Sequence, residues 1–169
     1  VMAFLFMRRQ KKMRASIQVE IDTFWRDHRD TEAPFVTLQL PLYNEKEVAE
    51  RLMFSAAEID YPRQRFEIQV LDDSQDETRG IVDRTAEGLR AQGIQVSVVR
   101  RPDRRDFKAG ALMYATPLAR GEYLAIFDAD FIIPREFLKR TVALIDSHPE
   151  VACVQGRWGH LNRHENWLT

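Results

Sequence analysis

Apolar and polar positions follow two different periods along this chain. Continuous apolar runs of strand length predict strands at residues 35–40, 66–71, 94–99, 123–127 and 151–155. Between them, apolar residues at helical spacing predict helices at residues 45–58, 76–92, 107–119 and 134–147, and a further helical segment is expected at 15–29. This regular alternation predicts an α/β fold with a parallel sheet and helices on both faces.

The order of the strands follows from the handedness of their connections. Right-handed crossovers leave few topologies. If the first three strands run outward in order and the fourth returns beside the first, the order is 3-2-1-4. The switch point, where such sheets bind ligands, then lies between the first and fourth strands. The apolar fourth strand is expected to be central and buried on both faces.

Two carboxylates end the fourth strand. Asp128 and Asp130 are one residue apart and precede Pro134, a residue suited to the first turn of a helix. Two hard oxygen ligands at this spacing can converge on Mg²⁺ or Mn²⁺, shared with substrate phosphates. Helix capping is the competing interpretation of the pair, and only the rest of the chain decides between them.

Other polar groups are expected at the same crevice, because the first and second strands end there too. Asp72 or Asp73 can accept hydrogen bonds from a nucleobase or ribose, Tyr43 can stack on a base, and Lys108 offers positive charge to a diphosphate. Four arginines, at positions 100, 101, 104 and 105, add charge, but for most of them a solvated loop is the preferred interpretation. Asn44 is a candidate cap for the following helix. Neither a G-x-G-x-x-G motif nor a Walker lysine occurs, which argues against dinucleotide and P-loop binding.

Composition and net charge limit the kind of protein further. The 169 residues, 44% apolar and 30% charged, suit one globular domain. A net charge of -1 gives no case for a nucleic-acid partner. Cys153 is the single cysteine, so an internal disulfide is excluded, and its apolar surroundings predict a buried side chain.

The apolar and basic residues at the N-terminus suggest that this domain follows a membrane helix. Residues 1–7 are apolar and a basic cluster follows at 8–14, although a bilayer span needs roughly 20 residues. We expect 1–33 to be a juxtamembrane stub and linker, 34–157 the ligand-binding part, and 158–169 the start of an interface or acceptor-side segment. The expected location is the inner face of the cell membrane.

Four motifs together carry a family resemblance. They are Pro41-x-Tyr43-Asn44-Glu45, Asp72-Asp73-Ser74, Phe107-Lys108-Ala109-Gly110-Ala111-Leu112 and Asp128-Ala129-Asp130. In this order and spacing the chain resembles the inverting family 2 glycosyltransferases, within them the cellulose-synthase-like branch and its glucomannan-synthase-like members. The resemblance covers roughly residues 34–162.

The resemblance implies a GT-A type nucleotide-diphospho-sugar transferase fold, present here as a partial domain, and a role for each motif residue. The residues implied to bind the donor are Tyr43, Glu45, Asp72, Asp73, Lys108 and Asp128. Asp128 and Asp130 would hold Mg²⁺ or Mn²⁺. The donor would be UDP-glucose or GDP-mannose, and the acceptor a glycan or lipid.

The sequence departs from the family pattern in one respect. The family's general base lies in a Thr-Glu-Asp motif and its acceptor site in a Gln-x-x-Arg-Trp motif, and neither occurs here. The base is therefore expected beyond the C-terminus, and this stretch alone is expected to bind donor without transferring sugar. Alternatives left open are a non-catalytic nucleotide-sugar-binding module, a sugar nucleotidyltransferase and a haloacid-dehalogenase-type phosphatase.

Overall fold

A computed structural model describes residues 2–156, with side chains from residue 13 onward. Its elements in chain order are α1 (Met2–Asp27), β1 (Val36–Leu42), α2 (Ala49–Ala57), β2 (Phe66–Asp72), α3 (Thr78–Ala91), β3 (Val96–Val99), α4 (Phe107–Ala115), β4 (Tyr123–Ile126) and α5 (Phe137–Ser147). Short 3-10 turns, Arg63–Arg65 and Thr116–Leu118, precede β2 and follow α4.

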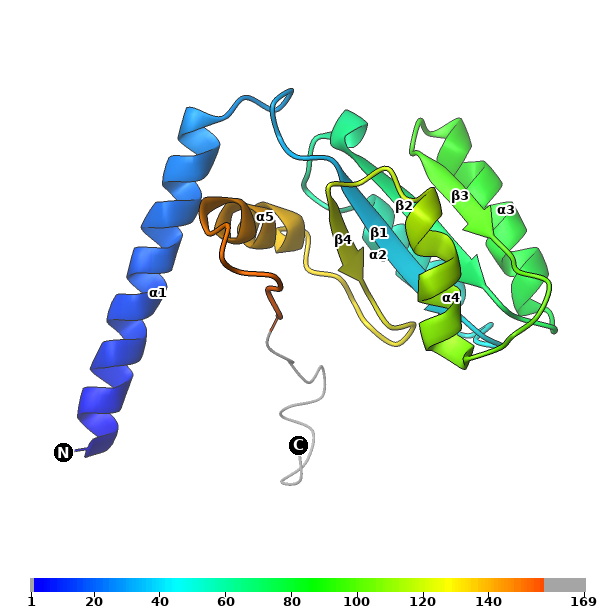
Figure 1. Cartoon of the computed structure of the whole chain (residues 1–169), viewed down its shortest axis with the longest axis horizontal. Helices are drawn as coiled ribbons and strands as arrows, with labels where there is room; N and C mark the ends of the chain where they lie inside the picture. The colour runs from blue at the N-terminus through cyan, green and yellow to red at the C-terminus, as the bar shows by residue number, and fades with distance from the viewer. Residues whose placement is uncertain (1, 157–169) are drawn as a thin grey trace.

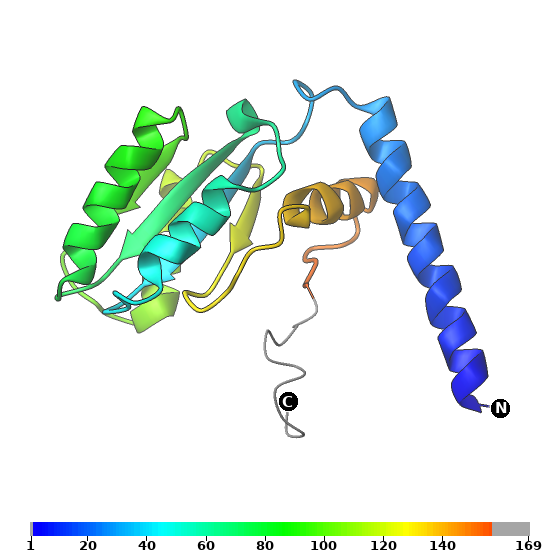
Figure 2. The ribbon, with the colours of Figure 1, turned by 180° about the vertical axis from the view of Figure 1, so that it is seen from behind.

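The four strands form one parallel sheet in the order β3-β2-β1-β4, which confirms the predicted topology. Leu38 in the centre of β1 pairs with Ile68 on β2 and with Ala125 on β4. Helices α2 and α3 cover one face and α4 lies on the other, so the sheet is the middle layer of a sandwich (Figures 1 and 2). The carboxyl ends of all four strands therefore point to one edge of the molecule.

The two faces of this sheet differ in polarity because successive strand residues point to opposite sides. Toward α2 and α3, the core contains Leu38, Ile68 and Leu52, each with no exposed surface. The other face carries buried polar pairs. Thr37 Oγ1 donates to Glu67 Oε1 at 2.9 Å, and the Gln39 amide donates to the Gln69 side-chain oxygen at 3.0 Å. The polar side chains on this face of β1 and β2 therefore pair with each other across the two strands.

Strand β4 lies at the edge of the described sheet and not at its centre. Tyr123 and Ala125 pack against the core, whereas Leu124 and Ile126 on the opposite face are 40% and 48% exposed. Within the described residues β4 pairs only with β1. The prediction of a central strand buried on both faces is therefore wrong for this part of the chain, since an apolar run cannot distinguish an edge strand from an inner one.

The predicted fifth strand is also wrong. Residues 151–156 carry no regular secondary structure, and Cys153 is exposed, not buried. A strand needs a neighbour to satisfy its backbone groups, and in the described chain this segment follows α5 without pairing to β4. The predicted interface segment, 158–169, lies outside the described residues.

Helix α1 confirms the helical segment expected at 15–29 and extends it to Met2. Its C-terminal half packs Ile21 and Phe24 against Ala143 of α5, and the Trp25 indole donates a 2.8 Å hydrogen bond to the Lys139 carbonyl. The N-terminal half projects away from the sheet (Figure 1). None of the helices in the described residues is both long and apolar enough to cross a membrane.

Candidate active site

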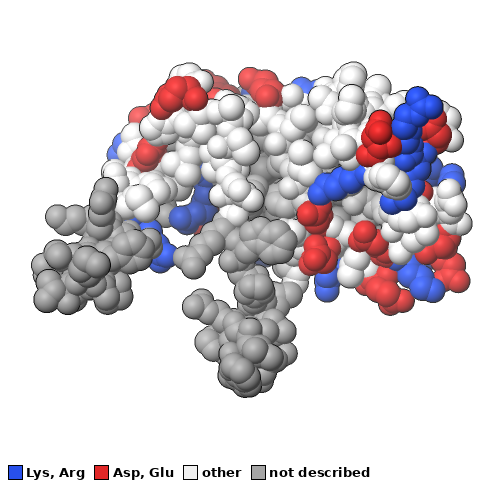
Figure 3. Space-filling model, turned by 60° about the horizontal axis from the view of Figure 1, so that its bottom comes forward, with Lys and Arg blue, Asp and Glu red and all other residues white. Residues whose placement is uncertain are grey.

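A cavity of about 480 Å³ opens at the carboxyl ends of β1, β2 and β4, beside the start of α4. Its lining consists of Pro41, Leu42, Tyr43, Glu45, Leu71, Asp73, Arg104, Lys108, Ala111, Asp128, Ala129 and Asp130. The structure thus brings together every site residue predicted from the sequence except Asp72. In Figure 3, acidic and basic side chains adjoin one another over this end of the molecule. We call this cavity the cleft.

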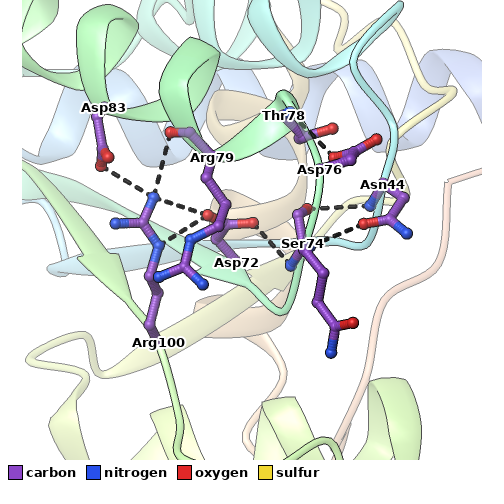
Figure 4. A network of polar contacts seen from close by, with 9 residues as sticks. Asn44, Asp72, Ser74, Asp76, Thr78, Arg79, Asp83 and Arg100 are labelled. Atoms are coloured by element: carbon purple, nitrogen blue, oxygen red, sulfur yellow. Dashed lines mark hydrogen bonds and ion pairs between the residues drawn. The ribbon is translucent and has the colours of Figure 1, made fainter.

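The loop after β1 is fastened to the loop after β2 by Asn44. This residue adopts a left-handed conformation, with φ of 54°. Its backbone N–H donates to Ser74 Oγ at 3.0 Å, and its side-chain oxygen accepts from the Gln75 N–H at 2.9 Å (Figure 4). The expected capping role is wrong, because α2 begins only at Ala49 and has no side-chain cap. Asn44 instead fixes Tyr43 and Glu45 at the rim of the cleft.

Both carboxylate oxygens of Asp72 accept hydrogen bonds from other groups of the protein. Its side chain is fully buried, and Oδ1 accepts the Ser74 N–H at 3.0 Å. Oδ2 accepts from Arg100 Nε at 2.9 Å, and Arg100 in turn reaches Asp83 on α3 (Figure 4). This network joins the ends of β2 and β3 to α3. Nucleoside contact by Asp72 stays a prediction, but the geometry gives this residue a structural task.

Asp73 lines the cleft and is paired with a second arginine. Arg101 Nε donates to Oδ1 at 2.9 Å and Nη2 to Oδ2 at 2.6 Å, and both side chains are less than a tenth exposed. Such a bidentate pair holds both groups in one orientation. The sequence does contain a signal for these contacts. Leu71 pairs with Val99, so continuing the register sets Asp72 and Asp73 opposite the two arginines that follow β3.

Arg104, expected only as one of four arginines that add charge, lines the cleft. Its guanidinium carbon lies 3.4 Å from the centroid of the Tyr43 ring and 4.8 Å from that of Phe107. Its Nε is buried without a hydrogen-bond partner among the described residues. A solvated loop was the preferred interpretation for most of these arginines, and it is wrong for Arg100, Arg101 and Arg104. Because Arg104 also lines the cleft, its stacked guanidinium adds positive charge there.

Three carboxylates, Glu45, Asp128 and Asp130, also line the cleft. Asp128 forms an ion pair with Lys108 from the first turn of α4. Burial, and then the negative charges of Asp130 and Asp128, hold the pKa of Glu45 above its ordinary value, while Lys108 acts in the other direction. The carboxylates are therefore close enough to repel one another, and positive charge would relieve this repulsion.

These residues fit a divalent cation that is shared with a ligand. Among side chains 13–156, no group of three His, Cys, Asp or Glu residues is placed to hold a metal ion. Asp128 and Asp130 could supply two of the hard oxygen ligands that such an ion needs. Mg²⁺ and Mn²⁺ commonly complete such a set with water and phosphate oxygens.

Comparison with known proteins shows the family to which the chain belongs. The family model "Glycosyl transferase family 2" matches residues 37–169. Glucomannan 4-beta-mannosyltransferase 7 of Arabidopsis thaliana is 39% identical over 140 residues, covering 80% of this chain and 25% of that protein. A probable glucomannan 4-beta-mannosyltransferase 7 of Oryza sativa subsp. japonica is 40% identical over 142 residues, covering 82% and 24%. The chain thus spans about a quarter of the length of these curated relatives.

Solved structures of known proteins also have a similar fold. The mannosyltransferase PcManGT from Pyrobaculum calidifontis, in complex with GDP-Man and Mn²⁺, is 31% identical with a TM-score of 0.63, covering 79% of this chain and 42% of that one. Staphylococcus aureus TarS is 28% identical with a TM-score of 0.59, covering 68% and 33%. The GT-A fold expected from the sequence is confirmed, as part of a domain. Because the family model covers most of the chain and the strand-end motifs meet at one cleft, this chain belongs to glycosyltransferase family 2, where it is similar to the cellulose-synthase-like glucomannan mannosyltransferases.

Proposed function

We propose that this chain supplies the donor and metal site of a hexosyltransferase that acts on a nucleoside-diphosphate sugar with inversion. The observation that carries the proposal is the charge arrangement of the cleft. Carboxylates line one wall, and two cations, Lys108 and Arg104, lie beside them in a cavity with an aromatic ring at its rim. A metal-bound diphosphate with a base attached has the complementary pattern.

Each group then has a task. Asp128 and Asp130 would hold Mg²⁺ or Mn²⁺, and the ion would supply positive charge to a diphosphate leaving group. Lys108 exchanges its ion pair with Asp128 for a phosphate oxygen, and the Arg104 guanidinium adds positive charge to the same cleft. Tyr43 and Glu45 bind the nucleoside, with Asp73 on the adjoining wall.

We propose GDP-mannose as the donor to test first, because the relatives are named as mannosyltransferases and PcManGT was solved with GDP-Man and Mn²⁺. UDP-glucose is the second candidate. The acceptor is a growing polysaccharide, with a lipid as the alternative. In the described residues the acids of the cleft all have other tasks, so we place the general base outside residues 13–156.

The proposed location is the inner face of the cell membrane, with the cleft on the cytosolic side. Its support is the apolar stretch 1–7 and the basic cluster that follows. Protease access from each side of sealed vesicles tests it. Cleavage of this domain from the cytosolic side alone is the expected result, and cleavage from the outer side alone would refute the orientation.

Radiolabelled sugar transfer tests the function. Membranes containing the full-length protein should transfer mannose from GDP-mannose into polymer when Mn²⁺ is present. Asp130→Asn should abolish transfer, and Asp60→Asn, an exposed aspartate paired with Lys139 away from the cleft, should not. Metal-dependent binding without transfer from either donor would instead favour a non-catalytic nucleotide-sugar-binding module. Release of free nucleoside triphosphate from donor and pyrophosphate would favour a nucleotidyltransferase.

A further inference from the structure

We propose that Arg101 is a positioning residue that holds residues 101–108, here called the cationic loop, over the cleft, and that Asp73 acts mainly through it. This inference rests on the proposed function, since Arg104 and Lys108 of that loop are the groups assigned to the diphosphate. It gives Asp73 a task other than direct contact with the nucleoside.

Arg101 is the polar centre of the cationic loop. One side of its guanidinium is taken by both oxygens of Asp73 at the end of β2. The other N–H groups turn back into the loop, where Nη1 donates to the carbonyl of Arg105 and Nη2 donates to the carbonyl of Phe107 at 2.7 Å. The planar, five-donor guanidinium can satisfy all these acceptors at once, which an ammonium cannot.

The loop needs this support because its backbone is unfavourable by itself. Asp106 and Phe107 are consecutive non-glycine residues with positive φ, 58° and 47°. Such conformations persist only where the surroundings fix them. The carbonyls that Arg101 binds, those of Arg105 and Phe107, flank this strained pair.

Helix α4 is packed against the same contacts. A Cβ on Gly110 would lie 2.1 Å from the Arg105 carbonyl oxygen and 2.4 Å from Arg101 Nη1. The start of α4, which includes Lys108, is therefore packed closely against Arg101 and the Arg105 carbonyl. Loss of the guanidinium would release Lys108 from its place beside Asp128 and Arg104 from the Tyr43 ring.

The test measures loop order and nucleotide affinity in the same variants of the full-length protein. These are Arg101→Gln, Arg101→Lys, Asp73→Asn and the Asp73→Asn/Arg101→Gln double variant. Arg105→Gln is the matched control, because it removes a positive charge from the same loop but leaves the ion pair with Asp73. Backbone hydrogen exchange reports loop order, and calorimetric titration with GDP and Mn²⁺ reports affinity.

We expect Arg101→Gln to speed exchange at the amides of 103–110 while β1 and β2 stay protected, and to weaken GDP binding about tenfold or more. Arg101→Lys should not rescue either property, and Arg105→Gln should change affinity less than about twofold. The double variant should bind no more weakly than the weaker single variant, because the two residues act as one unit.

Unchanged exchange in the loop of Arg101→Gln would overturn the inference, and so would additive losses of affinity for Asp73→Asn and Arg101→Gln. Exchange that rises equally throughout the sheet would also overturn it, since that would show a global stability role. Failure of the wild-type protein to bind GDP would refute the proposed function instead. The exchange data would still decide whether Arg101 orders the loop.

Discussion

A substitution at Asp72 distinguishes a role in stability from a role in ligand binding. Its fully buried carboxylate accepts one backbone N–H from Ser74 and two N–H groups from Arg100, at 2.8–3.0 Å. Replacement by alanine leaves the Ser74 N–H without its acceptor and leaves Arg100 with its two contacts on α3, the Asp83 carboxylate and the Arg79 carbonyl. Hydrogen bonds to charged groups contribute about 1.5–3 kcal/mol each, and loss of a partner from a buried ion pair costs about 3–5 kcal/mol.

Because Arg100 is about a quarter exposed and keeps Asp83, we expect the lower part of this range. Asp72→Ala should reduce the free energy of unfolding by about 2–3 kcal/mol. Asp83→Ala removes the half-exposed partner of the same arginine and should cost less than about 1 kcal/mol. The measurement is urea unfolding followed by tryptophan fluorescence, read as a shift of the midpoint at constant slope. An Asp72→Ala protein as stable as wild type would refute the structural role, and loss of nucleotide affinity at unchanged stability would place Asp72 on the nucleoside.

Three further changes have defined outcomes. Leu38→Ala, at a position with no exposed surface, should lower the free energy of unfolding by about 2–5 kcal/mol, and Leu118→Ala, 56% exposed, by less than about 0.5 kcal/mol in the same assay. Gly110→Ala should lower both the thermal midpoint and GDP affinity, because its Cβ has no room beneath the cationic loop. His148 donates a hydrogen bond to the Glu20 carboxylate, which raises the pKa of His148 above 6.5, so the stabilisation of the α1–α5 contact is complete below pH 6.5 and is lost as pH rises through the folded value. NMR titration should show the His148 pKa falling toward 6.5 in Glu20→Gln.

The sheet order and most of the cleft could be predicted from the sequence because each depends on local patterns. Strand-length apolar runs, helical spacing and the handedness of crossovers determine which strand ends meet. Once β1 and β4 are neighbours, Tyr43 and Asp128 must lie near each other.

The wrong predictions concern the spatial neighbours of a residue, which the sequence pattern does not show. The apolar run of β4 does not reveal that Leu124 and Ile126 face outward at a sheet edge, and residues 151–155 have strand composition but no described partner strand. The arginine contacts depend on strand register. Arg101 reaches Asp73 only because β2 and β3 end level with each other, and Arg104 reaches Tyr43 only because the loop is then fixed.

The metal-dependent binding of a nucleoside diphosphate is the measurement that tests the proposed cleft most directly. Calorimetric titration of GDP should give binding with Mn²⁺ and little or none with EDTA, because the carboxylates beside Glu45 would otherwise repel the diphosphate. Asp130→Asn should weaken the metal-dependent binding and leave the thermal midpoint close to that of the wild type, since this residue lines the cleft. Equal affinity for GDP with and without metal, or an Asp130→Asn protein that binds as the wild type does, would contradict the assignment of Asp128 and Asp130 to the metal.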